Sequence, residues 1–368
     1  MYIHQRRHWP RFEWDAETVA EKLAAIRYRQ GRLLGRMESM GFTLRADAVL
    51  QTITLDVLRS TEIEGEFLAP DQVRSSVARH LGMDVAGLVP SDRHVDGVVE
   101  MMLDATRNYK DQLTAERLYG WNSSLFQGGY SGMYKIDTGK WRTNEKGPMQ
   151  VVSGPIGYER VHFVAPDAEL LDKEMSGFLA WFNSVTTLDP VLKAGIAHFW
   201  FVTIHPFDDG NGRIARAITD MLLARADESD QRFYSMSAQV RKERNEYYQQ
   251  LESAQRGDLD ITDWLLWFLD CLDHSLAATG DTLGQVLQKA RFGDKHANTA
   301  LNDRQRTMVN KLFDGFEGKL TSSKWAKIAK CSQDSALRDL QDLVEKGMLT
   351  KEPAGGRSTS YVLALDIK

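Results

Sequence analysis

The sequence predicts a mainly α-helical protein, and three observations lead to that prediction. Apolar residues recur at spacings of three and four in most segments, which is the period of a helix with one buried face. Before the last part of the chain, only residues 134–163 contain runs of β-prone residues. Near the middle, an apolar run over 194–204 leads into a short glycine-rich loop, and a second helical pattern follows. We therefore expect a helical core that carries one β-hairpin.

Two amphipathic helices are predicted in the N-terminal part. Asp15 is a typical N-cap residue, and the apolar residues after it keep helical spacing until Gly41. A second apolar stripe over 49–58 runs into the acidic segment RSTEIEGE at 59–66. Gly65 is a typical C-terminal stop and is expected to end this helix.

Further helix and one hairpin are predicted between these segments and the middle of the chain. Residues 96–127 keep helical spacing, and the glycines of 128–132 end the pattern. The β-prone runs 149–153 and 160–164 flank the sequence GPIG at 154–157, which predicts a hairpin with its turn there.

The glycine-rich loop lies in the sequence HPFDDGNGRIAR at 205–216. Successive backbone N–H groups in such a turn form an anion-binding concavity, and the N-terminus of the next helix adds partial positive charge. Arg213 and Arg216 lie one helical turn apart and add two cations whose geometry suits phosphate. The segment therefore predicts a site for a chain of phosphates.

Two further side chains of this segment suggest a metal and a base. Asp209 offers oxygen atoms of the kind that Mg²⁺ binds alongside substrate phosphates. His205 can exchange a proton near neutral pH. A single histidine, an arginine pair or a Gly-Asn-Gly turn is usually structural. Because all of them fall within this one segment, in an order that lets them converge, the functional interpretation is favoured.

The pattern HPFxDGNGRxxR resembles the signature of the Fic-domain family without a mismatch. Members of that family transfer AMP from ATP to a hydroxyl group of a target protein. The resemblance implies that His205 is the general base and that Asp209 holds Mg²⁺ between the α- and β-phosphates. It also implies a phosphate site formed by Gly210, Asn211, Gly212, Arg213 and Arg216. Relatives that transfer phosphate instead tend to carry Lys at the position of Gly212, so we expect AMP transfer.

The acidic end of the second helix resembles an inhibitory motif that precedes many Fic cores. Ser60 and Glu64 are four residues apart and share a helix face. The resemblance implies that Ser60 steadies Glu64 and that Glu64 pairs with Arg216, which removes the cation needed for the γ-phosphate. An ordinary acidic helix end is the alternative interpretation.

The resemblance also assigns residues around the nucleotide. It makes the predicted hairpin a flap over the active site, with Val152, Ser153 and Gly154 at the nucleotide; a surface hairpin without a role is the alternative. It places the adenine beside Tyr247, Tyr248, Leu251 and Gln255. His198 shares a helix face with His205, and we expect it to be a packed core residue.

The last part of the chain is predicted to be a separate module. Three short helical patterns, a strand, a glycine-rich turn and a second strand follow one another over 296–368, which resembles a winged helix. These residues contain 12 Lys and Arg against 9 Asp and Glu, which falls short of the charge of a committed DNA-binding domain. DNA and protein remain equal alternatives as its partner. We thus expect an N-terminal helical domain over 1–95, a Fic core over 96–290 and a winged helix over 296–368.

Composition limits the remaining classes. The net charge of −5 argues against general nucleic-acid binding, and the apolar run over 194–204 is too short to span a bilayer. Two distant cysteines and no N-terminal apolar stretch fit a reducing cytoplasm, where we expect the protein to act. A transferase using another donor, such as UMP, phosphate or phosphocholine, and a DNA-binding regulator with a nucleotide-sensing core remain alternatives. Self-modification and a homo-oligomer are further expectations.

Overall fold

The computed structural model describes residues 1–39, 41–85, 87–145, 147–155, 158–313, 316, 318–352 and 359–365. Within its helices, the side chains of residues 43, 281–283, 285–287 and 290 are left out of the description. Throughout the described residues the fold is mainly α-helical, as predicted, and its strands form small two-stranded antiparallel ribbons.

The core is built around α7 (Pro190–Ile204) and α8 (Asn211–Asp227), which pack against each other. Residues 191–204 of α7 are all buried, which explains why this helix is apolar on every side. Asp189 caps its first turn through the backbone N–H of Val191. Because α7 and α8 are connected only by residues 205–210, the loop between them is held at both ends by buried helices.

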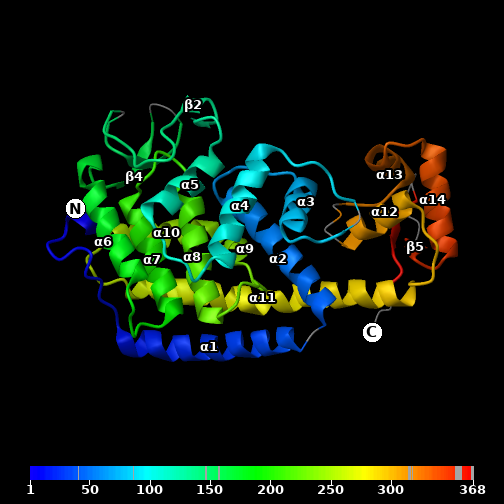
Figure 1. Cartoon of the computed structure of the whole chain (residues 1–368), viewed down its shortest axis with the longest axis horizontal. Helices are drawn as coiled ribbons and strands as arrows, with labels where there is room; N and C mark the ends of the chain where they lie inside the picture. Colours follow the sequence, from blue (N-terminus) through cyan, green and yellow to red (C-terminus); the bar gives the residue numbers. More distant parts are fainter. Residues whose placement is uncertain are drawn as a thin grey trace.

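Other helices cover this central pair, and they are arranged as Figure 1 shows. They are α4 (Arg93–Arg107), α5 (Ala115–Leu125), α6 (Leu171–Asn183), α9 (Met236–Lys242) and α10 (Arg244–Arg256). Two short 3-10 helices, η1 (Ile3–Gln5) and η2 (Ala168–Leu170), lie before α1 and α6 in the chain.

The N-terminal part forms α1 (Ala16–Glu38), α2 (Phe42–Ile63) and α3 (Pro70–His80). The Asp15 carboxylate accepts hydrogen bonds from the backbone N–H groups that open α1, which confirms the predicted N-cap. Gly65 has a φ of 84° just after α2 ends, so it occupies the left-handed region expected of a helix stop. α2 packs on α9, α11 and α3 and thereby reaches the central pair.

One prediction of a helix boundary was wrong. The segment 96–127 is not one helix, because α4 ends at Arg107 and Thr114 caps the new helix α5 with its side chain. The segment 280–299 passes from helix into a non-helical connection, as predicted: its helix is the second half of α11 (Thr262–Lys295), which continues through residue 280 without a break. The helix α3 was not predicted.

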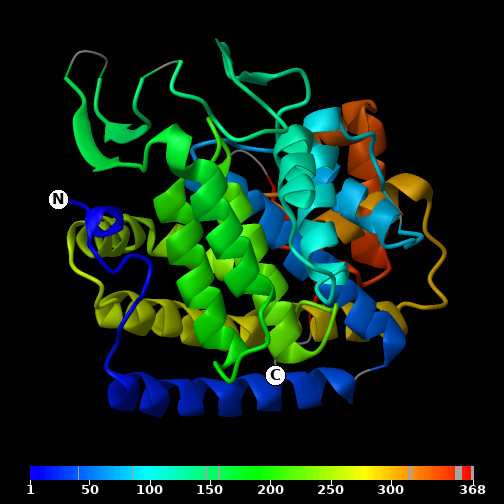
Figure 2. The ribbon, with the colours of Figure 1, turned by 60° about the vertical axis from the view of Figure 1, so that its left-hand side comes forward.

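α11 runs along the length of the molecule and connects two hydrophobic clusters (Figure 1). One cluster includes residues from Ile3 to Leu276 and surrounds α7 and α8. The other includes residues from Phe292 to Tyr361 and forms the C-terminal module. α1 lies beside α11 in both views (Figures 1 and 2), and Arg29 pairs there with Asp273.

The C-terminal module contains three helices followed by a hairpin, in the predicted order. These elements are α12 (Asp303–Phe313), α13 (Ser322–Ala329), α14 (Gln333–Glu345), β5 (Leu349–Lys351) and β6 (Tyr361–Leu363). β5 and β6 pair antiparallel, and an additional bridge joins Leu320 to Tyr361. The predicted glycine-rich turn at 353–358 lies outside the described residues, and the domain limits remain a prediction.

Two further hairpins lie at the same end of the core (Figure 2). β1 (Tyr130–Ser131) pairs with β2 (Tyr134–Lys135), and this small ribbon was not predicted. β3 (Gln150–Ser153) pairs antiparallel with β4 (Arg160–Val164), in agreement with the sequence prediction. Residues 156 and 157 of the predicted turn lie outside the described residues.

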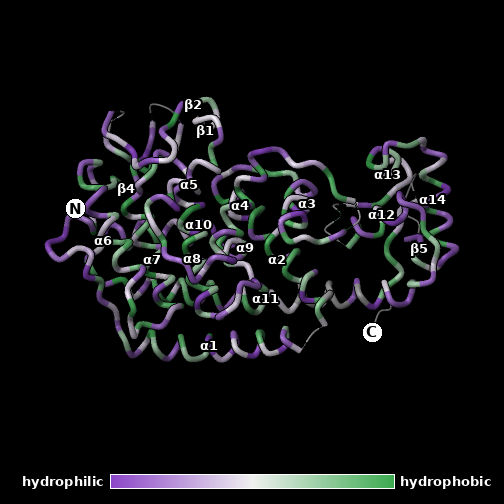
Figure 3. Tube along the Cα trace, viewed as in Figure 1, coloured by the Kyte–Doolittle hydropathy of each residue, from purple (hydrophilic) through white to green (hydrophobic). Residues whose placement is uncertain are grey.

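Hydrophobic and hydrophilic residues are mixed along the trace of the chain (Figure 3). Along α1 the colour alternates between apolar and polar residues, as an amphipathic helix requires (Figure 3). None of the helices in the described part of the chain is both long and apolar enough to cross a bilayer. Cys271 and Cys331 are free thiols.

Candidate active site

The loop between α7 and α8 requires two left-handed residues. His205 ends α7 with φ 54° and ψ 57°, and Gly210 precedes α8 with φ 86°. A Cβ atom at position 210 would lie 2.9 Å from Cε2 of Phe126, so this position needs glycine for its backbone angles and for space. The chain therefore turns sharply from α7 and presents the first backbone N–H groups of α8 to the loop.

Two buried side chains hold this loop in shape. The Asn211 side chain accepts a hydrogen bond from Phe207 N (3.0 Å) and donates one to Phe207 O (2.8 Å). Arg142, which is 3% exposed, donates from Nε to His205 O (2.8 Å) and from Nη2 to Pro166 O (2.5 Å). Asn211 thus contributes its backbone to the anion site while its side chain clamps the loop. Sequence reasoning did not find Arg142, because no local pattern marks it.

The tautomer of His205 is fixed by a backbone contact. Its Nδ1 lies 3.2 Å from the carbonyl oxygen of Val202, which can only accept a hydrogen bond. Nδ1 therefore carries the proton and Nε2 keeps its lone pair. Burial lowers the pKa of His205 to about 4, against the carbonyl contact and the carboxylates of Asp209 and Glu64, which raise it. The imidazole is accordingly neutral at physiological pH.

Asp209 lies beside the loop and is partly open to solvent. One of its carboxylate oxygens accepts from the N–H of Gly210, and the other accepts from the hydroxyl of Ser131 in β1. In the described residues no three His, Cys, Asp or Glu side chains are grouped as a metal site. A divalent ion here would have Asp209 as its carboxylate ligand and would need substrate oxygens to complete its shell.

Arg216 is buried and is held by the end of α2. Its Nε donates to Ser60 Oγ (2.8 Å), and its Nη2 donates to Ser60 O (2.7 Å) and to Glu64 Oε1 (2.8 Å). The expected pairing of Glu64 with Arg216 is therefore present in the structure. Ser60 contacts Arg216 and not Glu64, so the resemblance misplaced its contact. The remaining Nη1 of Arg216 is buried without a hydrogen-bond partner among the described residues.

Arg213 is held by a second carboxylate, which the sequence did not reveal. Its Nη1 donates to Glu66 Oε2 (2.8 Å), and its guanidinium carbon lies 4.9 Å from the ring centroid of Phe126. The other oxygen of Glu66 lies 2.6 Å from Nε2 of His94. This contact lowers the pKa of Glu66 and raises the pKa of His94. Glu66 follows the predicted inhibitory motif in the acidic segment 59–66, which is the one sequence signal that could have drawn attention to it.

Gly212 lets Glu64 approach the loop. A Cβ atom at position 212 would lie against Oε1 of Glu64, far inside van der Waals contact, and 3.2 Å from Nη1 of Arg216. Any larger residue at this position would therefore collide with the Glu64 carboxylate. Arg213 and Arg216 are thus both paired with acidic side chains from one short segment, Glu66 and Glu64.

The residues expected at the adenine lie on α10. Tyr247 is buried and its hydroxyl lies 2.9 Å from Nε2 of His198, whereas Tyr248 is 38% exposed. Leu251 is buried, and the buried amide of Gln255 lies 3.3 Å from Oγ1 of Thr203 on α7. Of the residues expected at the adenine, only Tyr248 is therefore exposed to solvent, whereas Tyr247, Leu251 and Gln255 are buried. His198 is a core residue as predicted, and burial lowers its pKa to about 3.

The β3–β4 hairpin is tied to α10 at one edge. Ser153 Oγ lies 2.6 Å from His162 Nε2, whose Nδ1 lies 2.7 Å from Glu252 Oε2 on α10. Val152 is 47% exposed, and Gly154 has a φ of 105°. Within the described residues β3 has only β4 as a neighbour, so its outer edge has unpaired backbone groups.

The comparison with protein families identifies the core. A family described as "Fic/DOC family" matches residues 112–223, which include the loop and both arginines. The chain contains a Fic/DOC domain. A second family, described as "Domain of unknown function (DUF4172)", matches residues 2–83, which include α1, α2 and the segment around Glu64.

Curated relatives of the Fic/DOC domain carry the name "Protein adenylyltransferase Fic". The protein of Drosophila erecta is 33% identical over 157 residues, which cover 40% of this chain and 30% of the relative. That of Drosophila sechellia is 38% identical over 155 residues, covering 39% of this chain and 30% of the relative. The matched region thus spans about 30% of the length of these relatives.

Two solved structures share the fold. A Fic family protein from Desulfovibrio desulfuricans gives a TM-score of 0.54 at 20% identity, with 95% of this chain and 97% of that chain covered. A Fic domain containing signaling protein from Bacteroides thetaiotaomicron gives a TM-score of 0.52 at 18% identity, with 70% and 98% covered. At these identities the likeness concerns the fold alone.

Proposed function

We propose that this protein is a protein adenylyltransferase, which moves AMP from ATP to a Ser, Thr or Tyr hydroxyl of a target protein. The observation that carries this proposal is the loop itself. A neutral His205 with a free Nε2 stands at one end of an anion-binding turn, and Arg213 and Arg216 stand at the other. The names of the curated relatives support the same activity.

The reaction assigns one proton transfer to the protein. The target hydroxyl oxygen bonds to the α-phosphorus of ATP, while the bond from that phosphorus to the pyrophosphate oxygen breaks. Nε2 of His205 accepts the hydroxyl proton, and this step contributes roughly 10²–10⁴-fold. The other contributions are positioning and charge stabilisation, because phosphoryl chemistry needs little covalent help.

The buried arginines fit a chain of phosphates. Nη1 of Arg216 and Nε of Arg213 are buried donors without hydrogen-bond partners in the described part of the chain. Such donors are costly unless a ligand or water satisfies them, and phosphate oxygens would do so. Mg²⁺ at Asp209 would neutralise phosphate charge, and this carboxylate keeps a partly exposed position suited to that role.

The same arginines support a proposal of autoinhibition. Glu64 occupies Arg216 and Glu66 occupies Arg213, so both cations are paired within the chain itself. A hundredfold suppression needs about 2.8 kcal/mol. One charged hydrogen bond contributes about 1.5–3 kcal/mol, so each of these pairs is strong enough to restrain ATP and weak enough to be displaced.

The β3 edge supports a mode of target recognition. Its unpaired backbone groups can bind an extended segment of the target by strand addition, next to the exposed side chain of Val152. The target hydroxyl would then approach His205 from the side of Ser153 and Gly154. A second copy of the chain can serve as the target in the same way.

Transfer of label tests the proposal directly. Wild type, Glu64→Gly and His205→Ala are each incubated with Mg²⁺ and α-labelled ATP, and label is counted on protein. We expect Glu64→Gly to carry at least about tenfold more label than wild type, and Glu64→Gly combined with His205→Ala to carry none. Absence of label from Glu64→Gly would reject ATP as the donor, and a panel of UTP, γ-labelled ATP and CDP-choline would then identify another.

A further inference from the structure

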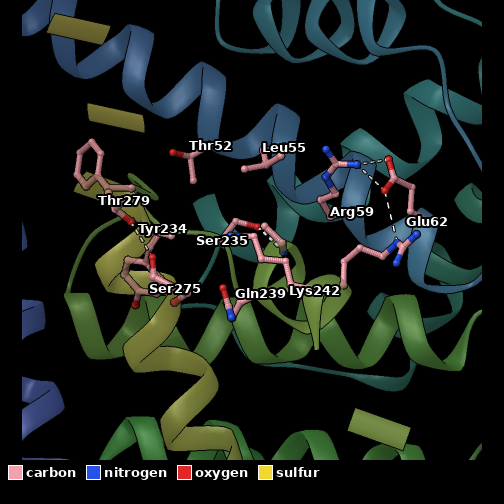
Figure 4. Close-up of a pocket in the computed structure, with 14 residues that line it drawn as sticks. Thr52, Leu55, Arg59, Glu62, Tyr234, Ser235, Gln239, Lys242, Ser275 and Thr279 are labelled. Atoms are coloured by element: carbon pink, nitrogen blue, oxygen red, sulfur yellow. Dashed lines mark hydrogen bonds and ion pairs between the residues drawn. The ribbon is translucent and has the colours of Figure 1, made fainter. Parts of the chain in front are cut away.

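A cavity of about 400 Å³ lies beside α2, and its lining includes none of the residues 205–216 (Figure 4). It is enclosed by α2, by the segment that leads into α9, by α9 itself and by α11. Its size is that of a small-molecule site. Among the described cavities it is separate from the arginines of the loop, so the proposed reaction leaves it without a role.

One end of the cavity is positively charged. Arg59, Glu62 and Lys242 gather there in Figure 4, and Arg241 lies beside them. Three cations thus face one carboxylate among the residues that line the cavity. The rest of the lining is uncharged, with apolar, hydroxyl and amide side chains: Thr52, Leu55, Phe233, Tyr234, Ser235, Ala238, Gln239, Ser275, Ala278 and Thr279.

The cations have donors that Glu62 does not satisfy. Nη1 of Arg59 binds both Glu62 oxygens, at 2.6 and 2.5 Å, which leaves its other nitrogens free of that carboxylate. Nε of Arg241 is buried, lies 3.6 Å from Glu62 Oε2 and has no hydrogen-bond partner among the described residues. Lys242 is exposed at the rim. A buried donor without a partner, beside an excess of positive charge, indicates a missing anion.

We propose that this cavity binds a small organic anion, with a phosphate or carboxylate group on Arg241 and Lys242 and a compact apolar body between Leu55 and Phe233. The apolar part of the lining explains why the ligand is not a bare inorganic ion. The cation cluster explains why it is not a neutral molecule.

The ligand would act on the proposed autoinhibition, and this part of the inference rests on the proposed function. Arg59 and Glu62 face the cavity, whereas Ser60 and Glu64, in the same last turns of α2, face Arg216. An anion on Arg241 and Lys242 replaces Glu62 as the partner of Arg241 and repels the Glu62 carboxylate. The last turn of α2 then loses its hold on α9, and Glu64 leaves Arg216 more readily. The cavity is thus an effector site that relieves inhibition.

Binding is tested with phenyl phosphate, which combines an anion with an apolar ring, and with inorganic phosphate and phenol as its separate halves. Calorimetric titration of the full chain should show phenyl phosphate binding at least about tenfold more tightly than either half. Lys242→Glu should weaken it about tenfold, and Ala278→Leu, which fills the cavity, should abolish it. Lys173→Glu, an exposed charge reversal on α6, should leave it unchanged.

A second pair of variants separates this cavity from the catalytic loop, which also attracts phosphate. Arg213→Gln should leave phenyl phosphate binding intact if the ligand sits in the cavity. Loss of binding in Arg213→Gln, with no effect of Lys242→Glu or Ala278→Leu, would place the ligand in the loop and overturn the proposal. So would the absence of binding by wild type.

Regulation is tested by label transfer. Saturating phenyl phosphate should raise the labelling of wild type severalfold and leave Ala278→Leu unchanged. Glu62→Gln, which frees Arg59 and Arg241 without any ligand, should reproduce the rise. Binding without a rise in label would overturn the proposed regulatory role, but it would still support the cavity as a binding site. If Glu64→Gly is not labelled, the proposed adenylyltransferase activity is contradicted. The cavity is tested separately, because calorimetry measures phenyl phosphate binding without any label transfer.

Discussion

The catalytic loop and the acidic segment that covers it are held in opposite ways. Asn211 and Arg142 fix the loop through buried hydrogen bonds, and the helices on either side of it are buried. The acidic segment reaches the loop with carboxylates that remain partly exposed: the side chains of Glu64 and Glu66 are 32% and 39% exposed. The loop is thus part of the buried core, whereas the acidic segment packs against it with partly exposed carboxylates.

This difference suggests how the protein is controlled. The hydrogen bonds that fix the loop are buried and costly to break. The ion pairs of Glu64 and Glu66 each join a buried arginine to a carboxylate that solvent and ligands can reach, so a competing anion can displace them. Under the proposed function, the loop would therefore be preformed and the acidic segment would be its removable restraint. Variants in the loop should reduce stability and activity together, while variants in the acidic segment should raise activity at little cost to stability.

The largest effect is expected from Asn211→Ala, which removes both hydrogen bonds that clamp the loop. Two buried backbone groups of Phe207 lose their partners, so the free energy of unfolding should fall by about 2–4 kcal/mol. Labelling in the Glu64→Gly background should fall at least about a hundredfold, because His205 is no longer held. Denaturant unfolding and label counting measure the two effects, with exposed Asn245→Ala as the control. An unchanged stability would mean that the loop is not held as described.

Gly212→Ala should test the contact between the acidic segment and the start of α8. The new Cβ collides with the Glu64 carboxylate, so Glu64 must leave Arg216, and labelling should rise about tenfold. In the Glu64→Gly background that collision is absent and only the close approach to Arg216 Nη1 (3.2 Å) remains, so the same substitution should lower labelling and not raise it. The double-mutant cycle measures this coupling. Equal effects of Gly212→Ala in both backgrounds would contradict it.

Glu66→Gln should have a smaller effect than Glu64→Gly, because the Glu66 side chain is more exposed and its carboxylate is shared between Arg213 and His94. We expect labelling to rise severalfold, and the two substitutions together to exceed either alone. ATP titration followed by tryptophan fluorescence should show tighter binding in the same order. Glu38→Gln, an exposed change at the end of α1, is the matched control. An unchanged affinity for ATP would show that Arg213 is already available in wild type.

The smallest effect concerns pH and His94. Its contact with Glu66 raises its pKa above the ordinary 6.5, so protonated His94 stabilises the fold. This contribution is complete below pH 6.5 and is lost as the pH rises through the raised pKa. The melting temperatures of wild type and His94→Gln should therefore differ most at about pH 5.5 and converge at about pH 8.5. A difference that grows with pH would contradict this assignment.

Sequence reasoning succeeded where the signal was local. The cap at Asp15, the all-apolar α7, the loop after it and the β3–β4 hairpin each follow from neighbouring residues. The pairing of Glu64 with Arg216 was expected only through the resemblance. Contacts without local periodicity were missed, such as Arg142 on the loop and Glu66 on Arg213, which are 147 residues apart.

The missed boundary between α4 and α5 also has a physical cause. α5 begins anew at Thr114 because a capping hydroxyl overrides a spacing that would have continued. In the second half of α11, by contrast, Leu283, Val286, Leu287 and Ala290 keep helical spacing in the sequence, and the helix continues to Lys295.

The continuity of α11 fixes an angular relation between the two ends of the molecule. Its 34 residues form a rod about 50 Å long, which carries residues of both hydrophobic clusters. Inserting one residue in its second half would advance the C-terminal module by about 1.5 Å but swing it by about 100° around the rod. That swing would pull Lys311 of α12 away from Asp71 of α3, with which it pairs. Insertions in the second half of α11 therefore keep the C-terminal module facing α3 only when they add whole helical turns.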